Sequence, residues 1–342
     1  MSKLNRLLLI STLFITVALG ANQWFQRYLD TPLQIKQKAY VLVVPRGANF
    51  TGVANQLEGE GLLRYHQLLV IYARLTEQTA IKSGEFSLPR STTLRQLLPI
   101  LLRGQAVQYA VTLIEGWRAV DALAALAEND VLQLTDLNPV LIAQQLELGE
   151  TAFSLEGRLF PDTYFFERGV STFDIVRRAK LQMDDVLSAE WSQRADELPY
   201  DNAYQALVMA SIVEKETGVD AEREQIAGVF VARLRKGMRL QTDPTVIYAM
   251  GDQYQGNIRR KDLRIVSPYN TYRVSGLPPT PIALPGQRSI YAALHPLENG
   301  MLYFVARGDG SHQFSATLEE HQAAVRKFQR QRRADYRSTP QP

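Results

Sequence analysis

An uncharged apolar segment at the N-terminus constrains this chain more than any other feature. No residue between Arg6 and Arg27 carries a charge, and residues 7–19 are almost all apolar. A helix of about 20 such residues crosses a bilayer. Lys3 and Arg6 precede the segment, so the positive-inside rule places residues 1–6 in the cytoplasm. The sequence therefore predicts a single-pass anchor over residues 7–26 in the plasma (inner) membrane, with the remainder facing the periplasm or wall side.

Two other interpretations of this segment remain open. Ala18 and Gly20 are small residues of the kind found at the cleavage site of a signal peptide. A buried core helix would need a polar face, which this segment lacks. Trp24 and Phe25 extend the apolar run to an interfacial aromatic position, which favours a retained anchor.

Composition excludes several kinds of chemistry. The 342 residues include no cysteine, which rules out thiol catalysis, disulfides and metal–sulfur sites. The four histidines lack the spacing of a paired metal motif, and no phosphate-loop or dinucleotide glycine pattern is present. Thirty-eight basic residues against 35 acidic ones are too balanced for a nucleic-acid-binding surface. We expect no cofactor, no metal and no nucleic-acid partner.

The exported part begins with a repeated strand–turn–helix pattern, typical of small α+β modules. Alternating apolar residues predict short strands, and helical spacing follows each strand. The three predicted pairs are a strand at 40–45 with a helix at 53–63, a strand at 86–90 with a helix at 94–104, and a strand at 107–113 with a helix at 120–126. A scaffold or spacer would show the same pattern.

The remainder is predicted to be one larger α+β domain. Helices are expected over 173–187, 204–213 and 226–234, and a short helix runs from an Asp243 N-cap to Gly251. An extended proline-rich loop (276–286) and a strand near 302–305 follow. The expected organisation is a linker (27–39), a small module (40–105), a catalytic domain (106–330) and a basic tail (331–342).

Glu214 is the polar residue that most needs a functional explanation. The eight residues from Ala206 to Val213 contain one hydroxyl and no charge, so their helix is expected to be buried. A carboxyl that follows directly loses hydration, which favours the protonated form that a general acid requires. A helix-end glutamate paired with Lys215 or Arg233 is the structural alternative. Glu216 competes for the same role, and the pattern does not separate the two.

A second candidate region interleaves aromatic and polar side chains. Residues 155–166 combine Glu156 with aromatic residues, which suits either a sugar-binding pocket or a structural turn. Further polar groups lie where elements are expected to end, at Gln241, Asp243, Tyr269, Asn270 and Thr271. His312, in a predicted turn at 308–314, is expected to be structural.

Six motifs together closely resemble the MltG (YceG-like) endolytic murein transglycosylases over about residues 40–330. They are LEGRLFPDTY (155–164), SIVEKET (211–217), LQTDPT (240–245), YNTY (269–272), GLPPTP (276–281) and FVARGDGSHQF (304–314). The resemblance implies that the small module is LysM-like and that Glu214, the first glutamate of its motif, is catalytic. Arg158 departs from the tyrosine-like residue expected there, which puts a sugar contact in doubt.

The resemblance also implies a reaction. Glu214 would cleave the β-1,4 bond between N-acetylmuramic acid and N-acetylglucosamine without water, leaving 1,6-anhydro ends that terminate or trim nascent strands. Substrate contacts are expected from Glu156, Gln241, Asp243, Tyr269, Asn270 and Thr271. Partners would be peptidoglycan strands, the membrane and cell-wall synthases. Two alternatives stay open: a hydrolase (muramidase) in which Glu156 or Asp243 activates water, and a non-catalytic wall-binding scaffold.

Overall fold

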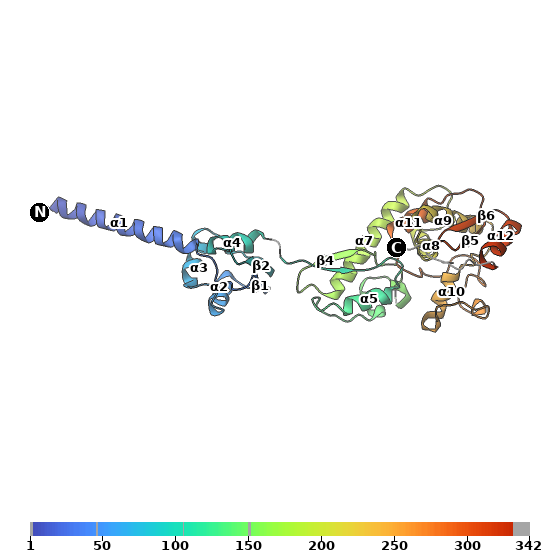
Figure 1. Ribbon diagram of the computed structural model, residues 1–342, viewed down its shortest axis with the longest axis horizontal. Helices are drawn as coiled ribbons and strands as arrows, with labels where there is room; N and C mark the ends of the chain where they lie inside the picture. Colours follow the sequence, from blue (N-terminus) through green and yellow to red (C-terminus); the bar gives the residue numbers. More distant parts are fainter. Residues whose placement is uncertain (1–2, 46, 105, 150–151, 331–342) are drawn as a thin grey trace. The chain divides into compact units, whose positions relative to one another are not determined.

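The computed structural model describes residues 3–45, 47–104, 106–149 and 152–330. The chain divides into two compact units. Unit 1 runs to Tyr109 and includes Phe165–Gly169, and unit 2 contains Ala110–Tyr164 and the chain from Val170 onward. Both units mix helices and strands (Figure 1), which confirms the α+β class. The predicted tail at 331–342 lies outside the described residues, and the predicted domain boundaries stay predictions.

Helix α1 (Lys3–Leu29) contains the predicted anchor. Its segment Leu8–Leu29 is long and apolar enough to cross a membrane, with a mean hydropathy of 1.5. The apolar side chains from Leu8 to Leu19 are exposed, because none of the described residues outside α1 covers this part of the helix. A signal sequence has the same properties, so the length and composition of α1 do not decide between the two.

Unit 1 contains a two-stranded antiparallel sheet covered by three helices. Strands β1 (Ala39–Val44) and β2 (Gly84–Pro89) pair so that Leu42 lies opposite Phe86. Alternation buries Leu42 and Val44 and exposes Val41 and Val43. The helices are α2 (Phe50–Gly59), α3 (His66–Leu75) and α4 (Leu94–Arg103). Thr93 caps α4 in a capping box with Gln96, and the helix predicted at 94–104 is confirmed, whereas α3 was not predicted.

Unit 2 starts with short elements. Strand β3 (Tyr109–Thr112) pairs with β4 (Thr163–Phe166), and both strands cross the boundary between the units. In the part that belongs to unit 2, the hydroxyls of Thr112 and Thr163 lie 2.9 Å apart. Between them lie α5 (Ala119–Ala127), α6 (Pro139–Gln145) and the 3-10 helix η1 (Ala152–Leu155). The strand and helix predicted between 107 and 126 are confirmed, with a shorter strand.

The core of unit 2 is helical. Helices α7 (Thr172–Ser192), α8 (Ala203–Glu216) and α9 (Asp220–Arg235) confirm the three predicted helices. Residues Ala206–Val213 of α8 are all buried, because α11 (Gln287–Leu294), α7 and α9 pack around it. This packing fixes the C-terminal end of α8 between the start of α9 and the start of α11.

The last elements complete unit 2. Helix α10 (Asp243–Met250) is followed by the short 3-10 helices η2 (Gly251–Gln253) and η3 (Asp262–Arg264). Strands β5 (Tyr303–Ala306) and β6 (His312–Ser315) form a hairpin, and α12 (Leu318–Val325) and η4 (Arg326–Arg330) follow. Strand β5 confirms the predicted strand. The segment 308–314 was expected to be a turn throughout and instead continues into β6, because Phe304 and Phe314 pair across the hairpin.

Candidate active site

Glu214 lies at the C-terminal end of α8, and its side chain is only 7% exposed. The main-chain N–H of Gly286 donates a hydrogen bond of 3.0 Å to Oε2. The Ser289 hydroxyl donates a second bond of 2.7 Å to the same oxygen. The other oxygen, Oε1, has Arg223 Nη2 at 3.5 Å, beyond ordinary hydrogen-bond distance. The carboxyl is therefore held in one orientation, with Oε1 as its less occupied oxygen.

Arg223 in α9 completes this arrangement. Its guanidinium is buried and donates to Asp220 at 2.9 Å and to the Ser289 hydroxyl at 3.3 Å. Ser289 thus accepts from Arg223 and donates to Glu214, which orients its single proton. Neither Arg223 nor Ser289 was singled out by sequence reasoning, since nothing in their local pattern marks them.

A second carboxyl, Glu115, lies close to Glu214 and was also missed. Its turn is fixed to the proline-rich loop, because Gly116 N–H donates to the Leu284 carbonyl at 2.9 Å and Leu284 N–H donates to the Trp117 carbonyl at 2.7 Å. Glu115 Oε1 lies 1.9 Å from the position that a Cβ on Gly286 would take. The two carboxyls therefore flank Gly286, with Glu214 bound to its N–H.

The surroundings of Glu115 make its ionisation less favourable than that of a free glutamate. Partial burial raises the pKa of Glu115, and the negative charge of Glu214 raises it further, while Arg223 opposes both effects. Glu115 is exposed to solvent, so its side chain can reach a ligand. The only sequence signal was the glycine at 116, which adopts the left-handed region at φ 77°.

Glu216, the competitor of Glu214, points into a different environment. It accepts a hydrogen bond from the Thr242 hydroxyl in the segment before α10. Burial raises the pKa of Glu216 to about 7, despite the Thr242 hydrogen bond and the charge of Arg233. Arg233 is committed to main-chain carbonyls, with bonds of 2.7 Å to both Leu240 and Leu302. Glu216 is therefore a half-buried carboxyl that forms no ion pair with any of the residues that the structure describes.

Gln241, Asp243 and Thr271 are brought together by main-chain bonds. Gln241 N–H donates to the Thr271 carbonyl, and Thr242 N–H donates to the Thr271 hydroxyl. The side chains of Gln241 and Asp243 are exposed, while Thr271 is fully buried. The predicted N-cap at Asp243 is wrong: Thr242 precedes the helix, and the Asp243 carboxylate accepts from the Tyr272 hydroxyl at 2.6 Å.

Asn270 is also buried, and its side chain amide donates to the carbonyls of Leu263 and Ile265. It closes the loop that carries Tyr269 and Thr271. The amide group therefore holds the shape of this loop.

Tyr269 and Glu156 belong to an aromatic cluster. The Tyr248 ring lies 4.9 Å from the Tyr269 ring, and its hydroxyl donates to Glu156 at 3.0 Å. Glu156 also accepts from the Ala119 N–H at 2.8 Å. Burial raises the pKa of Glu156, and these two hydrogen bonds oppose the shift. The ring of exposed Phe153 lies 6.1 Å from the Tyr269 ring, tilted by 42°, and gives the cluster a face open to solvent.

Arg158 and His312 have mainly internal contacts. The Arg158 guanidinium lies 4.3 Å above the Tyr204 ring, and its buried Nε has no hydrogen-bond partner among the described residues. His312 is buried and pairs with Glu222 at 2.7 Å. This contact agrees with the structural role expected for His312, which stays a prediction.

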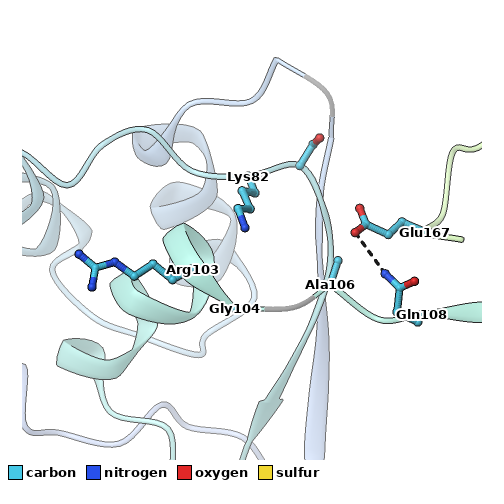
Figure 2. Close-up of a pocket in the computed structure, with 7 residues that line it drawn as sticks. Lys82, Arg103, Gly104, Ala106, Gln108 and Glu167 are labelled. Carbon is cyan, nitrogen blue, oxygen red and sulfur yellow. Dashed lines mark hydrogen bonds between the residues drawn. The ribbon is translucent and has the colours of Figure 1, made fainter. Parts of the chain in front are cut away.

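Unit 1 has an open pocket of about 490 Å³ that none of the predicted site residues lines. Figure 2 shows Gln108 and Glu167 beside one another on one side of it, where the Gln108 amide donates a hydrogen bond of 3.2 Å to Glu167. Exposed Lys82 and Arg103 supply its other charges. Within the described ranges, no group of three or more histidine or acidic side chains could hold a metal ion. Of the predicted site residues, Glu214 in unit 2 is a nearly buried carboxyl oriented by two hydrogen bonds, and its catalytic role stays a prediction.

Comparison with known proteins identifies close relatives. An endolytic murein transglycosylase of Bacillus subtilis (strain 168) is 31% identical over 330 residues, which cover 91% of both chains. One of Streptococcus pneumoniae (D39) is 29% identical over 92% of this chain, which spans 64% of that protein. The crystal structure of a yceG-like protein, lmo1499, from Listeria monocytogenes matches 84% of this chain and 98% of its own, with 30% identity and a TM-score of 0.54. The YceG-like family matches residues 42–327, and the chain therefore belongs to this family.

Proposed function

We propose that this chain is a membrane-anchored endolytic murein transglycosylase, a lyase that cuts peptidoglycan glycan strands. The observation that carries the proposal is the buried Glu214 carboxyl, oriented by Gly286 and Ser289 and facing Arg223. The similarity to a Bacillus subtilis protein named for this activity supports it. A binding protein would gain nothing from a carboxyl fixed in this way.

In the proposed first step, Glu214 donates a proton from Oε1 to the oxygen that links N-acetylmuramic acid to the next N-acetylglucosamine. The C1–oxygen bond then breaks through an oxocarbenium-like state, and the leaving sugar keeps the proton as a hydroxyl. Oε2 already accepts two hydrogen bonds, so Oε1 is the oxygen available to carry the proton. Arg223 stabilises the carboxylate that remains.

In the second step, the Glu214 carboxylate removes the proton from the muramic acid C6 hydroxyl. The C6 oxygen attacks C1 and closes a 1,6-anhydro ring, and Glu214 regains the proton it gave. No water is consumed. We propose that Glu115 stabilises the positive charge that develops on the sugar ring, because it is the second carboxyl beside Gly286.

Glu115 also gives the hydrolase alternative its best support. A glycoside hydrolase uses two carboxyls, one as acid and one to activate water or attack the sugar. Glu156 is engaged by Ala119 and Tyr248, and Asp243 by Tyr272, whereas Glu115 flanks the same glycine that binds Glu214. Hydrolysis would therefore use Glu115 in place of the two residues expected from sequence.

The remaining assignments are part of the same proposal. Gln241 and Asp243 contact the sugar directly, since both are exposed. Tyr269 contributes to sugar binding through the aromatic cluster that its ring forms with Phe153 and Tyr248. Glu156, Asn270 and Thr271 position these groups through their buried hydrogen bonds. The module at residues 40–105 is LysM-like and binds glycan, α1 anchors the enzyme in the membrane, and cell-wall synthases are its partners.

The test is mass spectrometry of purified peptidoglycan sacculi digested by the full-length protein in detergent. Anhydro ends, one water lighter than reducing ends and resistant to borohydride, are expected. Reducing ends would show a muramidase and overturn the proposed reaction. Binding without any cleavage would show a wall-binding scaffold.

A further inference from the structure

The last turn of α1 is part of unit 1 itself. Leu29 is 0% exposed in the core of that unit. The Phe25 ring lies 6.2 Å from the Tyr72 ring of α3, and the Tyr28 hydroxyl donates to the carbonyls of Arg64 and Tyr65. On the other side, Arg95 of α4 donates to Gln26 at 2.8 Å and to Asp30 at 2.7 Å. Packing and hydrogen bonds therefore fix the end of α1 to unit 1.

The length of α1 sets the height of unit 1 above a membrane. A hydrocarbon core of about 30 Å takes up about 20 helical residues, at about 1.5 Å per residue. The uncharged segment begins after Arg6, so a span counted from Leu7 ends near Gln26. Phe25, the first residue packed on α3, is therefore at the edge of the bilayer. The surface of unit 1 beside Phe25 lies at the level of the lipid headgroups.

An exposed apolar strip occupies that surface. Helix α3 buries Leu69, Val70 and Ala73, and exposes Ile71 (50%) and Leu75 (77%), one turn apart on the opposite face. Half-buried Leu68 lies on the same face, one turn before Ile71, and we call these three residues the α3 strip: Leu68, Ile71 and Leu75. Tyr72, which packs on Phe25, borders the strip. Figure 1 shows α3 on the side of unit 1 where α1 enters.

Charged and aromatic side chains around the strip match a lipid surface. Arg27, Arg64 and Arg74 are exposed, and none takes part in an ion pair within the described part of the chain. Trp24 and Tyr65 are exposed aromatic residues of the type enriched at bilayer interfaces. Basic residues around an apolar face favour anionic lipid headgroups.

We propose that the α3 strip inserts into the interfacial region of an anionic phospholipid bilayer. Unit 1 is then held against the membrane by two contacts, the anchor and the strip. This inference rests on the proposed membrane anchor. It gives unit 1 a fixed face toward the lipid.

The chain has no cysteine, so single labels test the proposal directly. Leu75→Cys, Val41→Cys and Ile15→Cys variants of the full chain carry one spin label each, in nanodiscs of phosphatidylethanolamine and phosphatidylglycerol. Val41 is the matched control, because it is apolar and 48% exposed on β1, away from α1 in Figure 1. Accessibility to oxygen, which partitions into lipid, is compared with accessibility to a water-soluble nickel chelate.

We expect the oxygen-to-nickel ratio at residue 75 to exceed that at residue 41 several-fold, with the highest ratio at residue 15. Equal ratios at residues 75 and 41, with a high ratio at 15, would overturn the strip and leave the anchor intact. A low ratio at residue 15 would overturn the anchor itself. Dipolar coupling between two residue-75 labels in one disc would show a second copy of the chain on the strip, and would also contradict the proposal.

Discussion

Glu214 and Glu216 are two residues apart on α8, yet their contacts suit them to different tasks. Glu214→Gln keeps the shape of the side chain and an oxygen that accepts from Gly286 and Ser289, so the fold is expected to be retained. It removes the proton that the proposed reaction needs, and positioned acid–base catalysis contributes about 10²–10⁴-fold in rate. We expect peptidoglycan cleavage to fall by that factor, measured by release of soluble fragments, with an unchanged circular dichroism spectrum.

Glu216→Gln is the matched variant for this experiment. Its carboxyl accepts from Thr242 and has no contact with Ser289 or Gly286, so cleavage is expected to stay within a few-fold of the wild-type rate. If Glu216→Gln abolishes cleavage and Glu214→Gln does not, the assignment of the acid is reversed.

Glu216 also predicts a pH dependence of stability. Its pKa is raised from 4.5 to about 7 in the folded state, so the folded chain holds a proton that the unfolded chain loses above pH 4.5. The stability that this proton contributes is fully present below pH 4.5 and is lost as the pH rises through 7. A shift of this size corresponds to at most roughly 3–4 kcal/mol of folding free energy. The free energy of unfolding, measured with urea, should fall less between pH 5 and pH 8 in Glu216→Gln than in the wild type. Equal falls in the two proteins would show that the pH dependence does not come from Glu216.

At the scale of elements, Gly286 directly precedes α11 and lies beside the carboxyls of both Glu214 and Glu115. Its φ of −76° suits any residue, so only the approach of Glu115 to 1.9 Å from a Cβ position requires glycine. Gly286→Ala is expected to displace Glu115 and reduce cleavage strongly. Glu115→Ala removes the collision, so Gly286→Ala should cost much less activity in that background than in the wild type. Purely additive losses would show that Glu115 and Gly286 act independently.

Gly59→Ala is a suitable control for that cycle. Gly59 is the last residue of α2, where a Cβ would meet nothing within 4 Å. Activity should be unchanged in this variant.

Local patterns allowed prediction of the elements that carry their own signals. Thr93 and Gln96 form the capping box that begins α4, and the apolar run of α8 implies its burial. Helix α11 begins at Gly286 without a side-chain cap, and strand β6 follows a glycine-rich turn, so neither begins with a local signal.

In the candidate site, too, only the features with a local sequence signal could be predicted. The burial of Glu214 was predictable from its own helix. Ser289, Gly286 and Glu115 were not, because they reach it from positions more than 70 residues away in the chain. Such contacts follow from tertiary packing, which periodicity does not specify.

At the scale of the whole molecule, the end of α1 joins the proposed anchor to the core of unit 1. Leu29 and Leu33 are buried in that core, and Asp30 is bound by Arg95, although this segment was expected to be a linker. A chain that begins at Asn22 keeps these contacts and loses the apolar segment. A chain that begins at Ile35 loses both leucines, at a cost of about 1.5–3 kcal/mol each.

That loss is comparable to the total stability of a small domain, about 5–15 kcal/mol. We therefore expect the chain from Asn22 to protect the amides of β1 from hydrogen exchange as the full chain does, and the chain from Ile35 to lose most of that protection. The amides of α8 in unit 2 provide the internal reference, since they should be equally protected in both. Equal protection of β1 in the two shortened chains would show that α1 does not contribute to the core of unit 1.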